Sequence, residues 1–429
     1  LHAGHGRGAC YGDSVARLYD RCGYDVVREF YINDRGLQMQ NFAASLAARV
    51  AGRDVPEDGY HGQYIVDWAA EMAAETSDGV GDGPGDAADP MEWGYTRALA
   101  SHRSVLESLS IDFDSWFSER SMIASGAIDS TLADLRAAGA VYEEGGAVWL
   151  RSTDHGDDKD RVLVKSDGEP TYLMPDVAYH RDKFGRADRL VNVFGADHHG
   201  YVARMHAAMA LLGHDPAELE IAITQLVSLQ RDGHEVRLSK RTGEMVELAE
   251  VVDEVGADAA RFTYLLLSVD SPQTFDMDLV ASQVNENPVF YVQYAHARIH
   301  QIVRRADEAG IGRGGLADVD LSLLSHPREL EVLRDLHELP DIVARACREQ
   351  APHQVTTWVR DLAASFHGFY HDCRVLGEGI EPALTVARLW LVEGARIGLA
   401  VALDLLGVGA PTEMWREDPV GGQSEGEGA

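Results

Sequence analysis

Residues 1–32, LHAGHGRGACYGDSVARLYDRCGYDVVREFYI, decide the fold class of this 429-residue chain. They open with a glycine-rich turn, and a helical pattern with one apolar side follows over 13–22. Gly23 then ends the helix, and the β-rich run 26–32 predicts a strand. Loop, helix and strand in this order make half of a βαβ unit.

The same order of elements recurs in the middle of the chain. The apolar run RLVNVF, residues 189–194, ends at Gly195, and 203–212 carries a helical pattern. Short apolar strands that alternate with helices predict an α/β fold with a Rossmann-type, doubly wound parallel sheet. Short strands with Gly and Asp turns over 139–166 predict a small β insertion in the sheet domain, over about 122–166. A structural hairpin pair without chemistry of its own is the plainer interpretation of that pattern.

The character of the sequence changes after residue 281. Long amphipathic stretches separated by turn residues predict an all-α helical bundle of about four or five helices. These stretches are 292–309, 327–348, 352–370 and 382–406. We therefore expect a sheet domain over 1–281, a helical domain over 282–414 and a disordered tail over 415–429. The Gly/Asp-rich segment 76–90 is expected to be a mobile, solvated loop.

The sequence argues against a membrane span and against a disulfide framework. The most apolar stretch, 384–408, is interrupted by Glu393, Arg396 and Asp404, so it predicts a buried helix pair. The cysteines lie too far apart in sequence for a zinc knuckle or a set of disulfides, and they are Cys10, Cys22, Cys347 and Cys373. A reducing cytoplasm is therefore the expected compartment.

The charge balance is strongly acidic. Lys and Arg number 38 against 70 Asp and Glu, which gives a net charge of −32. The long-range field of such a chain repels a polyanion, so charge alone argues against nucleic acid as a partner. Binding depends on a local basic track and not on the total, however, so an acidic chain can still hold a polyanion. The hydrophobic share of 45% and the charged share of 25% are typical of a soluble, folded protein.

Two short motifs carry groups suited to phosphate chemistry. His2-Ala3-Gly4-His5 leads into a helix, where glycine lets backbone amides approach an anion closely and the imidazoles add donors. The basic loop VRLSKRTG, residues 236–243, can close over the distal phosphates of a nucleotide. Each motif alone is equally compatible with a structural or metal-binding histidine pair, or with a solvated basic turn. Their combination favours nucleotide chemistry.

Together the two motifs resemble the HIGH and KMSKS signatures of class I aminoacyl-tRNA synthetases. Additional runs resemble the arginyl-tRNA synthetases in order and spacing, and they are 1–13, 29–40, 167–184, 194–202 and 286–299. The resemblance extends over roughly residues 1–414. It implies that the sheet domain is catalytic and that the helical domain binds the anticodon.

The resemblance also implies roles for individual residues. His2 and His5 are implied to stabilise the α-phosphate while the amino-acid carboxylate attacks it, and Lys240 to assist the departure of pyrophosphate. ATP contacts are implied for Gly4, Gly195, Asp197, His198 and Ser239. No metal site is expected from the adjacent His198 and His199, because neighbouring side chains diverge and no third ligand lies nearby.

Arginine recognition needs acidic or carbonyl groups, because a planar guanidinium has five donors and no acceptor. The resemblance implies an arginine pocket of Glu119, Tyr172, Asp176 and Gln225. The spacing of four between Tyr172 and Asp176 places both side chains on one face if the stretch is helical. Contacts with tRNA are implied for Tyr291, Tyr294, His296 and Arg298, although Tyr291 and Tyr294 are equally suited to the core of the bundle.

The implied reaction starts from L-arginine and ATP, with Mg²⁺ on the phosphates, and gives arginyl-adenylate and pyrophosphate. The arginyl group then passes to the 3′-terminal ribose of tRNA(Arg), and the family usually needs tRNA for the first step as well. No tightly bound cofactor is expected. The resemblance implies a cytoplasmic protein, and we expect a monomer.

The chain departs from the family pattern in three places. The Asn-Pro-Ser/Thr-Gly-Pro approach to the first motif, its strand and an N-terminal domain are absent, so the native protein is expected to be longer. Arg237 and Leu238 stand where Lys-Met is common, and a tail follows Met414. Three rival interpretations remain: a paralogue that arginylates a small acceptor, an inactive tRNA-binding protein, and a class I enzyme for another amino acid.

Overall fold

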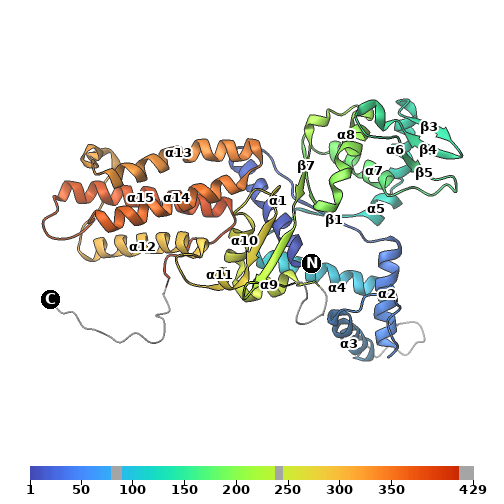
Figure 1. The fold of residues 1–429 in the computed structure, drawn as a ribbon, viewed down its shortest axis with the longest axis horizontal. Helices are drawn as coiled ribbons and strands as arrows, with labels where there is room; N and C mark the ends of the chain where they lie inside the picture. Colours follow the sequence, from blue (N-terminus) through green and yellow to red (C-terminus); the bar gives the residue numbers. More distant parts are fainter. Residues whose placement is uncertain (79–88, 237–244, 415–429) are drawn as a thin grey trace.

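The computed structural model describes residues 1–78, 89–236 and 245–414, apart from the side chains of 76–78 and 199. Four long helices of the C-terminal half lie side by side at one end of the molecule, and strands with shorter helices occupy the other (Figure 1). Helix α1 (Ala3–Arg21) contacts elements of both parts. The N-terminal motif therefore belongs to a helix at the junction.

Parallel strand pairs make up the sheet part of the described residues. β1 pairs with β2, β6 with β7, and β8 with β10, each in parallel. The strands are β1 (Glu29–Ile32), β2 (Ser115–Ser118), β6 (Leu190–Gly195), β7 (Leu219–Thr224), β8 (Val227–Arg231) and β10 (Gln273–Asp276), with β9 (His234–Glu235) antiparallel to β8. Parallel partners joined through helices confirm the predicted α/β fold class.

The glycine-rich start of the chain is helical, so the predicted turn is wrong. His2 is the N-cap of α1, and the helix begins at Ala3, well before the expected residue 13. The glycines are needed for close packing, because a Cβ on Gly6 would lie 2.7 Å from side-chain atoms of both Leu248 and Tyr264. They let α1 lie against α9 (Leu248–Val255) and α10 (Ala257–Tyr264).

The strands predicted over 139–166 are present as an antiparallel sheet of β3 (Val141–Glu144), β4 (Ala147–Leu150) and β5 (Arg161–Val164). Leu150 and Leu163 of this sheet share a buried core with Leu190 of β6. The surrounding helices are α5 (Glu119–Ala124), α6 (Ala127–Ala137), α7 (Leu173–Phe184) and α8 (Val202–Leu211). The small sheet is therefore packed onto the parallel strands and does not stand apart from them.

Three helices between β1 and β2 were not anticipated from the sequence. They are α2 (Gly36–Val50), α3 (Gln63–Asp78) and α4 (Pro90–Ser108). Phe42, Leu46 and Ile65 form their own small core, separate from the main one. The first residues of the predicted loop 76–90 continue α3, and 79–88 lie outside the described residues.

The C-terminal helices begin where proline allows a helix to begin. They are α12 (Pro288–Glu308), α13 (Pro327–Glu349), α14 (Pro352–Asp372) and α15 (Pro382–Leu405), and each has proline in its first turn. Proline lacks the amide hydrogen that the first turn leaves unpaired in any case, so it favours these starts. The predicted helical bundle is thereby confirmed, with helix ends within a few residues of the expected ones.

The apolar stretch 384–408 is a single helix and not the predicted pair. No glycine turn or proline breaks it before Leu405, and the charges that interrupt the pattern are paired. Glu393 accepts hydrogen bonds from Arg396 at 2.8 and 2.9 Å and lies 2.8 Å from Arg313. Within the described ranges, no helix has the length and apolar character needed to cross a membrane. The predicted tail 415–429 lies outside those ranges.

Candidate active site

The N-terminal end of α1 lies beside the carboxyl ends of two parallel strands. Gly195 at the end of β6 is in register with Thr224 at the end of β7. A Cβ on Gly8 would lie 3.5 Å from Thr224 and 3.6 Å from Val193, so the first turns of α1 cross this edge closely. Ligands of open α/β sheets bind at such an edge, and a helix N-terminus adds an affinity for anions.

His2 and His5 form a close, tilted ring pair at this helix N-terminus, with ring centroids 3.6 Å apart. Nδ1 of His2 accepts a hydrogen bond from the Gly4 amide at 3.1 Å. Nδ1 of His5 accepts one from the His2 amide, also at 3.1 Å. Because each Nδ1 is an acceptor, a neutral ring must carry its hydrogen on Nε2. The two backbone contacts therefore fix the tautomer of both imidazoles.

Burial keeps the two imidazoles neutral. Burial first, and then the neighbouring His2, lower the pKa of His5 to about 4. Burial also lowers the pKa of His2. At neutral pH the pair thus offers two Nε2–H donors without a net charge, which suits a phosphate oxygen that gains negative charge during a reaction.

The segment that follows the basic loop is tied to this site. The Ala3 amide donates to the Val246 carbonyl at 2.8 Å, and the Leu248 amide donates to the Leu1 carbonyl at 3.0 Å. The predicted catalytic Lys240 and ATP contact Ser239 lie outside the described residues. The backbone pairing at Val246 nevertheless anchors the chain on their C-terminal side next to the histidines.

The predicted ATP contacts after β6 lie at the strand edge. Gly195 ends β6, and a Cβ there would lie 2.9 Å from the Asp197 carboxylate. The Asp197 and His198 side chains are 85% and 48% exposed and lie 3.6 Å apart. Gln225 follows β7 directly, and its backbone amide donates to the Val269 carbonyl at 3.0 Å. Gly195, Asp197 and His198 are exposed, and Gln225 is half-buried.

Arg7 holds the loops around this edge, and the sequence analysis missed it. It is 1% exposed and donates to the carbonyls of Ser268 at 2.7 Å, Ser271 at 2.6 Å and Gln225 at 3.3 Å. A guanidinium has enough donors to join two loops in this way. The only signal in the sequence was an arginine between two glycines of the first motif.

A second group of residues forms an acidic pocket, defined here as Tyr31, Glu119, Asp176 and Tyr201. The Tyr31 hydroxyl hydrogen-bonds to Glu119, and the Tyr201 hydroxyl donates to Asp176. Burial first, and then the Glu119 charge, raise the pKa of Asp176 to about 7. Burial also raises the pKa of Glu119, whose contact with Arg35 is long at 3.9 Å. Two crowded carboxyl groups of this kind favour binding of a cation.

Tyr172 is the most exposed residue of the predicted arginine pocket. Asp176 lies in the first turn of α7, as the spacing suggested, but Tyr172 precedes the helix and is 94% exposed. Tyr31 and Tyr201 supply the hydroxyl groups beside the carboxylates. Both lie in runs that resemble the family, 29–40 and 194–202, but they come from elements other than α7, so local spacing did not connect them with Asp176.

A relay of hydrogen-bonded polar groups connects Lys183 with the backbone carbonyl of Asp176. Lys183 donates to Asn192 at 2.5 Å, and the Asn192 amide lies 2.5 Å from Nε2 of His180. Nδ1 of His180 lies 2.7 Å from the Asp176 carbonyl. Burial lowers the pKa of Lys183 to about 8 and that of His180 to about 3. The lysine charge in turn lowers the pKa of Asp176, so it favours the ionised carboxylate.

Replacing Lys183 with methionine is expected to raise the KM for a cationic substrate of this pocket about tenfold, with kcat little changed. The pKa of Asp176 should rise further without the lysine charge, and one pKa unit corresponds to about 1.4 kcal/mol. Steady-state kinetics from pH 6 to 9 measure this effect as an upward shift of the inflection in kcat/KM. Lys165→Met, at an exposed lysine, is the control. An unchanged inflection in Lys183→Met would contradict the role of the relay.

The predicted tRNA contacts fall into two groups. Arg298 lies over the rings of Tyr294 and Tyr370, at 4.5 and 4.7 Å from their centroids, and Tyr291 packs on His367. These half-buried rings lie on α12 and α14. His296 is 3% exposed and contacts the Pro411 carbonyl at 2.9 Å, so it packs α12 against the chain that follows α15.

Comparison with known proteins gives one consistent picture. A family model described as "tRNA synthetases class I (R), catalytic domain" matches residues 1–57 and 102–301, and one described as "DALR anticodon binding domain" matches 292–414. The arginine–tRNA ligase of Frankia alni is 48% identical over 413 residues, which are 95% of this chain and 75% of that protein.

Solved structures agree with these family models. A crystal structure described as an arginyl-tRNA synthetase from Campylobacter jejuni superposes with a TM-score of 0.86 and 34% identity, over 96% of this chain and 91% of that one. The Thermus thermophilus arginyl-tRNA synthetase superposes with a TM-score of 0.76 over 96% of this chain and 80% of that one. At 24% identity, the second comparison supports the fold alone.

Proposed function

Because this chain belongs to the arginyl-tRNA synthetases of class I, we propose that its histidine pair and its acidic pocket carry the two halves of adenylate formation. The enzyme activates L-arginine with ATP and transfers the arginyl group to tRNA(Arg), with release of AMP and pyrophosphate. We propose that Mg²⁺ enters with the ATP phosphates as part of the nucleotide substrate.

The proposed role of His2 and His5 is to stabilise the α-phosphate. Their Nε2–H donors and the N-terminus of α1 form a preorganised set for the charge that develops when the arginine carboxylate attacks. We assign ATP binding to Gly4, Gly195, Asp197 and His198, which lie on or beside the strand edge. Lys240 and Ser239 keep their proposed roles at the distal phosphates.

The acidic pocket is the observation that carries the choice of amino acid. Two partly buried carboxyl groups with raised pKa values, Glu119 and Asp176, lie beside two tyrosine hydroxyls. A bound guanidinium supplies the missing positive charge and restores ionisation of both groups. A neutral amino acid would leave them unpaired. We propose that Gln225 lies at the rim of the same pocket. Tyr172 is proposed to contact arginine from its exposed position.

The helical domain is proposed to bind the anticodon side of tRNA, from about residue 282 to 414. The exposed edges of Tyr291, Tyr294 and Arg298 on α12 offer stacking partners for unpaired bases. Burial of His296 against the chain that follows α15 supports a packing role for it in place of a base contact. We further propose a cytoplasmic monomer.

Arginine-dependent exchange between ATP and pyrophosphate tests this function. We expect exchange with arginine, strongest when tRNA(Arg) is present, and none with lysine or glutamine. Exchange that is independent of tRNA would favour a paralogue that arginylates a small acceptor. Absence of exchange across a range of salt concentrations would favour an inactive tRNA-binding protein, and exchange with another amino acid would identify a different class I enzyme.

A further inference from the structure

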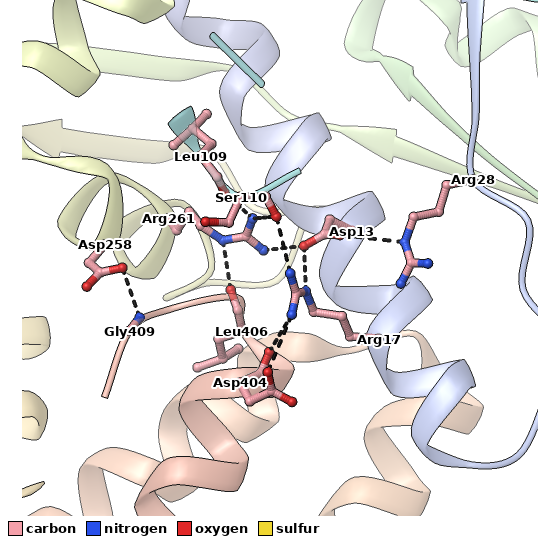
Figure 2. Close-up of polar contacts among 10 residues, drawn as sticks. All are labelled: Asp13, Arg17, Arg28, Leu109, Ser110, Asp258, Arg261, Asp404, Leu406 and Gly409. Atoms are coloured by element: carbon pink, nitrogen blue, oxygen red, sulfur yellow. Dashed lines mark hydrogen bonds and ion pairs between the residues drawn. The ribbon is translucent and has the colours of Figure 1, made fainter. Parts of the chain in front are cut away.

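Helix α1 carries the paired histidines at one end and a buried carboxylate near its middle. The Asp13 side chain is 3% exposed and faces three arginines. Arg17 donates to it at 2.8 Å, Arg28 lies 3.6 Å from it, and Arg261 of α10 donates to it from a fully buried position (Figure 2). Three arginines therefore surround one carboxylate, and none of the roles proposed for the site residues accounts for them.

Arg261 joins three parts of the chain through its guanidinium. Besides Asp13, it donates to the Leu109 carbonyl after α4 at 2.6 Å and to the Leu406 carbonyl after α15 at 2.9 Å. Its side chain is 1% exposed. Each of the three guanidinium nitrogens meets an acceptor from a different part of the chain, an arrangement that lysine is unable to reproduce. Figure 2 shows the guanidinium between these groups.

The end of α15 is shaped around this guanidinium. Gly407 has a φ of +65°, and a Cβ there would lie 2.1 Å from Nη2 of Arg261. Only glycine combines a readily adopted positive φ with the absence of a Cβ at this contact. Just beyond it, the Gly409 amide donates to Asp258 at 2.9 Å, one turn before Arg261 on α10. The chain that leaves the bundle is thus held by α10 at two successive turns.

A second bundle helix also ends on α1. The Tyr11 hydroxyl donates to the Gln350 carbonyl at 3.0 Å, and the Gln350 side chain donates to the Tyr19 hydroxyl at 3.1 Å. Gln350 caps α13 in a left-handed conformation, with a φ of +51°. The bundle therefore meets α1 directly at the C-terminal end of α13. It meets the end of α15 through Arg261 of α10 and through Arg17 of α1, which donates to the Asp404 carbonyl at 3.2 Å.

We propose that Arg261 is a positioning residue that couples the helical domain to the catalytic histidines through Asp13. This inference rests on the proposed function. An α-helix rises 1.5 Å per residue and is stiff over this length, so a displacement at Asp13 moves the N-terminus of α1 with it. A misplacement on the order of 1 Å can cost about 100-fold in rate. When tRNA settles on the bundle, the ends of α13 and α15 fix α1 in its productive position.

The test compares Arg261→Lys and Asp13→Asn with Arg388→Lys in tRNA-stimulated, arginine-dependent pyrophosphate exchange. Arg388 is the matched control, because it forms a buried ion pair with Glu329 inside the bundle and does not touch α1. We expect kcat to fall about 30- to 100-fold in Arg261→Lys and Asp13→Asn, with KM values for ATP and arginine and the Kd for tRNA within threefold of wild type. Arg388→Lys should retain kcat within threefold.

A double variant adds a readout that general destabilisation does not mimic. Because Asp13 and Arg261 act through one contact, Asp13→Asn combined with Arg261→Lys should lose no more kcat than either single variant. Losses that multiply, a fall in kcat no larger than in Arg388→Lys, or a change confined to KM would each overturn the inference. Wild-type protein without exchange would instead overturn the proposed function, and the inference with it. If Arg261→Lys does not fold, the volume-conserving Asp13→Asn decides alone.

Discussion

Replacing Asp176 with asparagine is expected to lower kcat/KM for arginine by roughly 100- to 1,000-fold. Asparagine keeps the shape of the side chain and still accepts the Tyr201 hydrogen bond. It removes the negative charge that faces the guanidinium, and loss of one partner of a buried charge pair costs on the order of 2–5 kcal/mol. Steady-state exchange kinetics with varied arginine measure the effect. Asp182→Asn, at an exposed aspartate on the same helix, is the control and should stay within threefold.

The pH dependence of the same variant tests the cause of the effect. The pKa of Asp176 is raised to about 7 in the free enzyme, mainly by burial and then by Glu119. Below that pH the carboxyl group is protonated and must lose its proton before it pairs with arginine. Wild-type kcat/KM should therefore fall as the pH drops through about 7, whereas kcat of the bound complex changes less. An identical inflection in Asp176→Asn would assign it to another group.

Replacing His5 with alanine is expected to lower kcat for arginine activation by about 100- to 1,000-fold, with little change in the KM for arginine. The substitution removes one preorganised donor to the α-phosphate, and loss of a comparable donor costs about that factor in other enzymes. Single-turnover formation of arginyl-adenylate measures the step directly. Because Nδ1 of His5 also caps the His2 amide, a loss of about 1 kcal/mol in stability accompanies the change.

His5→Gln distinguishes the loss of the hydrogen-bond donor from the loss of stability. The glutamine amide places a donor near the position of Nε2, so part of the rate should return. We expect kcat to be at least tenfold higher than in His5→Ala, which corresponds to about 1.4 kcal/mol of activation free energy. His371→Ala, at a histidine 87% exposed on the bundle, should leave the rate unchanged. Equal rates for His5→Gln and His5→Ala, in proteins with equal melting temperatures, would argue against hydrogen-bond donation by this imidazole.

The candidate site was only partly accessible from the sequence. The first motif, Asp176 and Glu119 could be named because they occupy short runs that resemble the arginyl-tRNA synthetases. Local periodicity placed Asp176 on a helix correctly, and Tyr172, four residues earlier, is the N-cap of that helix and 94% exposed. The spacing of four describes neighbours on one helix face, so it located Asp176 but said nothing about the exposure of Tyr172 at the helix start.

What the sequence determined by itself is the order and kind of the elements. Apolar strands such as 190–195, and helices that start at Pro327, Pro352 and Pro382, follow from residue periodicity and proline chemistry alone. These properties act between near neighbours, so they survive without knowledge of the rest of the chain. The apparent exception, the helical start of α1, needed Gly6, whose packing partners Leu248 and Tyr264 lie more than 240 residues away.

Only the tertiary structure decided which distant polar groups meet. Tyr31 and Tyr201 join the acidic pocket from separate elements, and Arg261 reaches Asp13 across 248 positions of sequence. A buried polar group must find a partner wherever packing brings one, and that partner leaves no trace in the local pattern. The residues that bind and react could therefore be anticipated in short motifs, whereas those that hold the motifs in place became visible only when the chain was folded.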